Sequence, residues 1–205
     1  MNDMSNVDNR FGLKPVRHLN GSPWNGQAVR CYLPSTDAVA MFIGDPVDLA
    51  GSADAAGVCP TVVKATAGDG NQIYGVITAF DPNPDDLSLV YRAASTARYC
   101  DVCIDPDVIF EIQACSGAIL ANTTVGLNAV LIYTHSGSTV TGMSGAEMDS
   151  GASAAPAADA SNQLLIMGLV DRADNDISAV NAKWEVIINL HRLRATGDGD
   201  GALGV

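Results

Sequence analysis

The sequence is poor in aromatic residues, in glutamate and in bases. Only 5% of its 205 residues are aromatic, and its acids are 20 aspartates and 3 glutamates. Aspartate favours turns whereas glutamate favours helices, so this imbalance argues against a helical protein. The 20 glycines and 9 prolines also indicate many turns. Because 47% of the residues are hydrophobic, the chain has enough apolar material for one well-packed domain.

The shortage of bases gives the chain a formal net charge of −12. A general nucleic-acid-binding protein needs a basic surface to neutralise phosphates, so we expect no nucleic-acid partner. The same charge disfavours binding to anionic membranes. The N-terminus lacks the basic-then-apolar pattern of a secretion signal, and no apolar run approaches the ~18 residues of a membrane span. These absences predict a protein made in the cytoplasm of a bacterium or of an infected cell, without a membrane partner.

The bases that are present gather near the N-terminus. Residues 9–30 contain four bases and no acid, whereas residues 31–205 contain 21 acids and 7 bases, a local charge of −14. The basic stretch also contains several large apolar side chains, which are unusual in a solvated tail. We therefore predict that residues 1–27 form an extended arm that docks on another protein, the alternative being a disordered terminus. The residues predicted to make this contact are Arg10, Phe11, Lys14, Arg17 and Trp24.

Short β-like runs, each closed by a turn signal, fill most of the remaining chain. They lie at residues 29–33, 38–43, 61–66, 72–80, 87–91, 99–104, 108–114, 127–133, 164–170 and 183–193. The sequence Gly68-Asp69-Gly70-Asn71 predicts that the third and fourth runs form a hairpin, because its glycines tolerate positive φ. In the last run Trp184, Val186 and Ile188 alternate with polar residues, which indicates a sheet covered on one side.

These runs predict an all-β domain at residues 28–193, a β-sandwich or β-barrel of short antiparallel strands resembling a jelly roll. Residues 135–163 are rich in serine, glycine and alanine and are too many for an ordinary loop. We expect this stretch to be an exposed insertion or to be ordered by a neighbouring molecule. Residues 194–205 are predicted to form a flexible C-terminal tail.

The five cysteines are expected to be reduced and partly buried. Cys100 and Cys103 form the one Cys-x-x-Cys sequence, but no second ligand pair completes a zinc site. A redox motif would need a helix after it, and here another β run follows. On a strand the two thiols point to opposite faces, so we predict structural thiols.

Patterns typical of catalysis are absent from the sequence. His18, His135 and His191 have no metal-binding spacing, and each is predicted to be a surface or hydrogen-bonded histidine. The acidic segment at residues 171–176 lacks the glycine and glutamate of a calcium loop and is predicted to form a turn. No Gly-x-Ser-x-Gly sequence occurs. We therefore predict no catalytic residues, no metal site, no cofactor and no enzymatic activity.

Four segments together resemble a known family. They are RFGLKPVRHLNGSPWNG, MFIGDPV, YGVITAFDPNP and LLIMGLVDRADNDISAVNAKWEVIINLHR, and they span the chain from Arg10 to Arg192. In combination they are similar to the decoration, or cement, proteins of tailed-bacteriophage capsids. The resemblance implies a β-rich structural protein, a homotrimer, that binds the outside of an expanded capsid in the virion. It implies the major capsid protein as the partner, and it implies no catalysis.

Two other functions are compatible with an acidic all-β chain. One is a carbohydrate- or receptor-binding module of a phage tail fibre or spike. Such a module usually exposes aromatic rings, but the chain has only two tryptophans and the pattern places Trp184 in the core. The other is a small hydrolase, for which the sequence offers no catalytic constellation.

Overall fold

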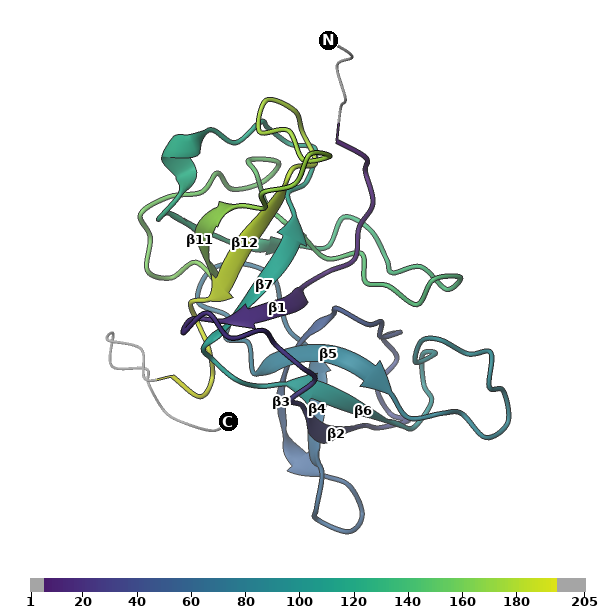
Figure 1. The fold of residues 1–205 in the computed structure, drawn as a ribbon. Coiled ribbons are helices and arrows are strands. Elements are labelled where there is room, and N and C mark those ends of the chain that lie inside the picture. Colours follow the sequence, from purple (N-terminus) through teal and green to yellow (C-terminus); the bar gives the residue numbers. More distant parts are fainter. Residues whose placement is uncertain (1–5, 195–205) are drawn as a thin grey trace.

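The computed structural model describes residues 6–194 and is all-β, as the sequence predicts (Figure 1). Its strands are β1 (Lys14–His18), β2 (Val29–Leu33), β3 (Pro46–Ala53), β4 (Pro60–Lys64), β5 (Gly75–Phe80), β6 (Arg98–Cys103), β7 (Val108–Gln113), β8 (Asn128–Ala129), β9 (Leu131–Ile132), β10 (Glu147–Met148), β11 (Leu164–Leu169) and β12 (Lys183–Ile188). The one helical element in this range is the 3-10 turn η1 (Asn122–Thr124).

The strands form a barrel and an open sheet. The closed barrel has the order β2-β4-β3-β5-β6, and all its pairs are antiparallel except β2 with β4. The open antiparallel sheet has the order β1-β7-β12-β11-β8, and β9 pairs separately with β10. The predicted all-β barrel or sandwich is thus confirmed, and Figure 1 shows the barrel below the sheet.

Each unit has its own apolar core. Trp184, Val186 and Ile188 alternate along β12 and are buried with Phe110 in the sheet core, as the sequence pattern predicts. The barrel core contains Cys31, Leu33, Met41, Val47, Val62, Ile77, Cys100 and Val102. Burying such side chains contributes roughly 1.5–3 kcal/mol each, so these two clusters supply the main driving force for folding.

The described part of the predicted N-terminal arm, residues 6–27, belongs to the fold of this chain. It runs along the sheet as the purple segment of Figure 1, and β1 pairs with β7 as an edge strand. The sequence did not predict β1, because Pro15 argues against a central strand. An edge strand such as β1 tolerates proline, since not all of its N–H groups are needed for pairing. The outer side of β1 is closed by the same segment, since the Trp24 N–H donates to the carbonyl oxygen of Val16 (3.1 Å).

The Ser/Gly/Ala-rich stretch at 135–163 is also part of the fold. Its central residues 144–150 are buried, and they include β10, which pairs with β9. Asp149 organises the following turn by accepting backbone N–H groups of Gly151 (2.8 Å), Ala152 (2.7 Å) and Ala154 (2.9 Å). Contacts inside this chain, and not only a neighbouring molecule, therefore order the segment. The predicted tail, residues 194–205, lies outside the described residues except for Arg194.

Three strand predictions were wrong. Residues 61–66 and 72–80 contain β4 and β5 but form no hairpin, because β3 lies between these strands in the barrel. The predicted runs at 38–43 and 87–91 are not regular strands. They are loop segments joined by an isolated bridge between Met41 and Arg92.

Candidate interaction surface

The N-terminal segment begins at the far end of the sheet, where Asn6 fixes it. The buried Asn6 amide donates to the carbonyl oxygens of Asp176 (2.8 Å) and Val180 (3.0 Å), and its oxygen accepts the N–H of Asp176 (2.7 Å). These bonds attach the segment to the loop between β11 and β12. Since an unpaired buried amide is costly, they hold the segment in one position.

Arg10 and Phe11, both predicted to contact a partner, make contacts within this chain. The Arg10 guanidinium lies 2.6 Å from the Asp8 carboxylate and 3.1 Å from the buried carboxylate of Glu147. Phe11 is half-buried, and its carbonyl oxygen lies against the backbone of Gly44. The charge of Arg10 is therefore already neutralised within the chain.

Lys14, Arg17 and Trp24 lie on β1 or just after it. Arg17 pairs with Glu185 of β12, and Trp24 packs against the sheet core while its indole N–H donates to the Gln27 carbonyl (3.3 Å). Lys14 is exposed, and within residues 6–194 no acid pairs with its ammonium group. Binding of another protein by the five predicted residues stays a prediction. Of their three basic side chains, Lys14 is the one without an acidic partner in residues 6–194.

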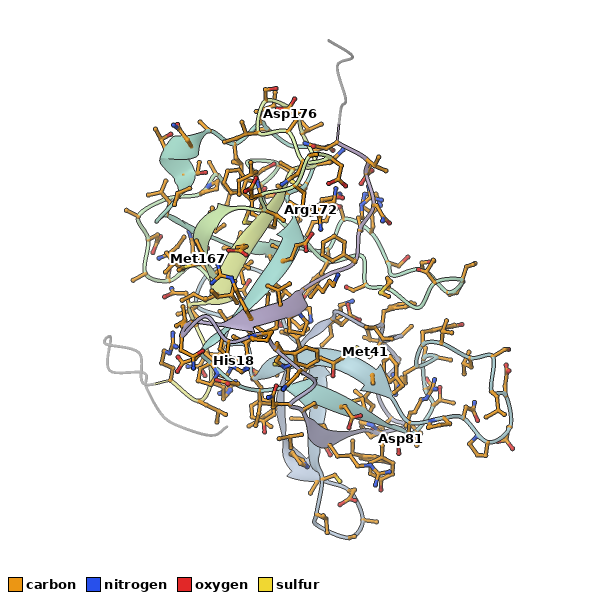
Figure 2. The ribbon with its side chains drawn as sticks, in the orientation of Figure 1. His18, Met41, Asp81, Met167, Arg172 and Asp176 are labelled. Carbon is orange, nitrogen blue, oxygen red and sulfur yellow. The ribbon has the colours of Figure 1, made fainter. Side chains whose placement is uncertain are left out.

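Two glutamates that the sequence did not single out lie side by side on the face of the sheet opposite its apolar core. Glu111 of β7 is in register with Glu185 of β12. Arg172, labelled on this face in Figure 2, lies 2.8 Å from the Glu111 carboxylate, and Arg17 pairs with Glu185. Each carboxylate thus has its own guanidinium. The two ion pairs lie next to each other across neighbouring strands, where pairs of opposite charge stabilise a sheet.

Within residues 6–194, no group of three or more histidine, cysteine, aspartate or glutamate side chains is placed to hold a metal ion. Cys100 points into the barrel core and Cys103 into the sheet core, so the predicted opposite orientation is confirmed. Burial raises the pKa of Cys31 to about 12 and that of Cys103 to about 11. Thiols with such pKa values are poor nucleophiles at neutral pH.

The histidines are placed as predicted, at the surface or in hydrogen bonds. His18 lies 3.1 Å from the Asp105 carboxylate, and His135 is exposed. His191 is fully buried, and its Nδ1 accepts the Leu193 N–H (3.1 Å).

The most distinctive surface is built from residues 34–43, 81–97 and 136–144, which we call the loop cluster. Met41 and Arg92 exchange two backbone hydrogen bonds, each 2.9 Å long. The Ile43 N–H donates to the Gly142 carbonyl (2.8 Å), and the Ser144 N–H donates to that of Ile43 (2.8 Å). The first segment, residues 34–43, is therefore joined to both others. In Figure 1 the teal loop after β5 and the green loop after β9 extend from the same side of the molecule.

Arg92 holds the loop cluster together from inside. Its side chain is fully buried, and its guanidinium donates to the carbonyl oxygens of Thr96 (2.7 Å), Asp37 (2.9 Å), Pro34 and Val39. The Asp37 carboxylate lies 3.6 Å away and supports the charge. Desolvation lowers the pKa of Arg92, and Asp37 opposes that shift. Because a planar guanidinium has five donors, this one side chain fixes two loops at once.

A second arginine fixes the base of the 81–97 loop. Arg98 of β6 donates to the carbonyl oxygens of Asp81 (2.9 Å), Leu89 (3.0 Å) and Tyr91 (2.5 Å). The Tyr91 ring then stacks on Phe42, with centroids 5.1 Å apart and planes 11° apart. Figure 2 labels Asp81 and Met41 on this side of the molecule. The long loop is therefore ordered by its own contacts, unlike a mobile surface loop.

Large apolar side chains point outward from this ordered surface. Val140 is 86% exposed and Leu87 81%, and Val39, Val90 and Met143 are also exposed. Such side chains on rigid loops are typical of a protein-interaction site. The sequence does not reveal this surface, because the carbonyl groups bound by Arg92 and Arg98 come together only in the folded chain. The sequence offered one signal for Arg92 and Arg98: bases are rare in residues 31–205, which contain only 7.

Comparisons with known proteins add no assignment: no family model, no curated protein and no solved structure matches the chain. Within residues 6–194, no helix is long and apolar enough to cross a membrane.

Proposed function

We propose that the protein is a non-enzymatic structural protein of a tailed-phage virion. It binds the outer surface of the capsid and stabilises contacts between neighbouring major capsid protein subunits. The observation that carries this proposal is the loop cluster, in which exposed apolar side chains stand on loops fixed by Arg92 and Arg98. A rigid surface of this kind suits docking on another protein, because little conformational entropy is lost on binding.

Three further features support a structural role. The all-β body is compact around two cores, and its acidic charge reduces unspecific binding to the packaged DNA. The chain is also similar in sequence pattern to capsid decoration proteins from Arg10 to Arg192. A homotrimer presenting three loop clusters would bind a symmetric shell with an avidity well above that of one contact.

A carbohydrate-binding module of a tail fibre or spike is the alternative, and its support is weaker. Trp184 is fully buried and Trp24 is half-buried. The half-buried rings of Tyr32 and Tyr99 lie 5.2 Å apart, but the Arg30 guanidinium covers the Tyr99 ring at 4.2 Å. A stacked sugar would have to displace that cation.

The proposal is tested by mixing the purified chain with capsids assembled from the major capsid protein encoded in the same phage genome. We expect the chain to sediment with expanded capsids at a fixed stoichiometry and to raise the temperature at which they disassemble. Unexpanded shells serve as the control and should bind less. If the chain stays in the supernatant with both kinds of shell, the proposal is wrong.

A further inference from the structure

We infer that the loop cluster, residues 34–43, 81–97 and 136–144, is the docking surface, and that its partner patch is apolar and bordered by lysine or arginine. The inference rests on the proposed function, because the partner considered is the capsid surface. The loop cluster makes the contact, and an apolar patch with a basic border on the capsid surface receives it.

The apolar character of the partner patch follows from the exposure of the cluster. Leu87 and Val140 have more than four-fifths of their surface in water, and Val90 and Met143 are more than one-third exposed. Val90 also lies against Gly142, where an added methyl group would be 3.0 Å from the Val90 Cβ atom. The apolar side chains of the second and third segments are therefore neighbours. Covering them with apolar groups removes this surface from water, at roughly 25 cal/mol per Å².

The charge of the partner patch follows from the acids of the cluster. Its three segments contain four acids, Asp37, Asp81, Asp85 and Asp86, and one base, Arg92. Arg92 is fully buried and lies near the Asp37 carboxylate, and Arg30 pairs with Asp81. The exposed charges that no described base pairs are therefore those of Asp85 and Asp86, and both are negative. The Ser88 hydroxyl and N–H hydrogen-bond to the Asp86 carboxylate and lower its pKa, which keeps this acid ionised at neutral pH.

A cationic border on the partner complements these acids, whereas a second copy of the same cluster would repel them. Like charges brought together across an interface oppose binding, and opposite charges accelerate it and fix its register. Asp85 is the most useful probe of this point, because it is exposed and its carboxylate takes part in no hydrogen bond or ion pair within the described chain.

The test measures binding of full-length variants to expanded capsids by sedimentation, together with the mass of each free variant in solution. The apolar variant is Leu87→Ser with Val140→Ser, and its matched control is Val58→Ser, since Val58 is 77% exposed in the β3–β4 loop outside the cluster. The charge variant is Asp85→Lys, and its control is Asp69→Lys at another exposed turn. All five positions are exposed, so we expect every variant to fold.

We expect the apolar variant to bind capsids about tenfold more weakly, or worse, and Val58→Ser to bind within about twofold of wild type. Asp85→Lys should weaken binding and flatten its dependence on salt between about 50 and about 500 mM, whereas Asp69→Lys should not.

The possible failures are distinguishable. If wild type does not bind capsids, the proposed function fails and this inference fails with it. If wild type binds and both cluster variants bind equally well, the function stands and the loop cluster is not the docking surface. If the cluster variants change the mass of the free protein but not its affinity for capsids, the cluster is an interface between copies, which also overturns the inference. Tighter binding by Asp85→Lys would contradict a cationic partner patch.

Discussion

Gly12 and Gly44 cross with their backbones in contact. A methyl group on Gly12 would lie 2.2 Å from the Gly44 carbonyl oxygen, and the Leu13 N–H donates to that oxygen (2.9 Å). Both glycines have positive φ, 70° and 91° respectively. This crossing fixes the N-terminal segment where the sheet meets the barrel, because no other residue type fits either position.

Replacing Gly12 by alanine should therefore lower the free energy of unfolding by about 3 kcal/mol, through a strained φ and a clash with rigid backbone. Urea unfolding followed by tryptophan fluorescence measures the change. The control is Gly26→Ala. Gly26 also has a positive φ, 96°, but nothing lies within 4 Å of an added methyl group, so this substitution should lower the free energy of unfolding by about 1 kcal/mol. Equal losses for the two variants would show that the crossing is not tight.

Removing the buried guanidinium of Arg92 should loosen the loop cluster. Arg92→Met leaves at least four carbonyl oxygens without their donor, and we expect a loss of about 4 kcal/mol in stability together with new protease cleavage within residues 81–97. Thermal unfolding and mass spectrometry of the digest measure both effects. Arg30→Met removes an exposed arginine that pairs with Asp81, and should change little. Cleavage elsewhere, with the 81–97 loop intact, would contradict the role given to Arg92.

Burial of His191 should make stability depend on pH. Desolvation, assisted by Arg194 and opposed by Asp105, lowers the pKa of His191 from 6.5 to about 4. Between pH 6.5 and about pH 4, His191 therefore binds a proton in the unfolded chain but not in the folded chain. The stability from this group is complete above pH 6.5 and is lost as the pH falls towards 4, by about 3 kcal/mol in total.

His191→Asn keeps an acceptor for the Leu193 N–H and removes the titration. We expect the fall in unfolding free energy from neutral pH to about pH 4 to be shallower in this variant, whatever its stability at neutral pH. His135→Asn, at an exposed position, should retain the wild-type slope. An unchanged slope in His191→Asn would mean that His191 is accessible to protons in the folded protein.

The cysteines should be unreactive until the protein unfolds. All five are buried and free, and burial raises the pKa of Cys31, Cys100 and Cys103. A thiol-specific chromogenic reagent at neutral pH should label them slowly in native protein and label all five in denaturant. Fast labelling of Cys100 and Cys103 together in the native state would revive a redox or metal role for the Cys-x-x-Cys sequence.

The local sequence predicted the strands whose side chains alternate, and it could not predict how they are arranged. The run at 29–33 matches β2 residue for residue, and β12 buries the tryptophan, valine and isoleucine that the pattern selected. In contrast, β3 has the sequence PVDLAGSA, whose glycine, alanines and serine do not favour a strand. It is held by hydrogen bonds to β4 and β5, which lie on either side of it in the barrel.

The N-terminal segment shows the same limit for function. Its charge and apolar residues predict an arm that docks on another protein, and that stays a prediction. The sequence could not show that the segment pairs with β7 of this chain. Arg10 pairs with the nearby Asp8, but its second acid, Glu147, and the Glu185 that pairs with Arg17 lie more than a hundred residues away in sequence. The loop cluster was not predicted for a similar reason, since Arg92 binds carbonyl groups that no pattern marks.

Cryo-electron microscopy of expanded capsids saturated with the purified chain tests the central claim most directly. We expect density for the all-β body on the outer surface of the shell, at symmetry-related sites that bridge neighbouring major capsid protein subunits. We also expect residues 34–43, 81–97 and 136–144 to face the shell. Density for the chain inside the shell, or no density for it on the outer surface, would contradict the proposed function.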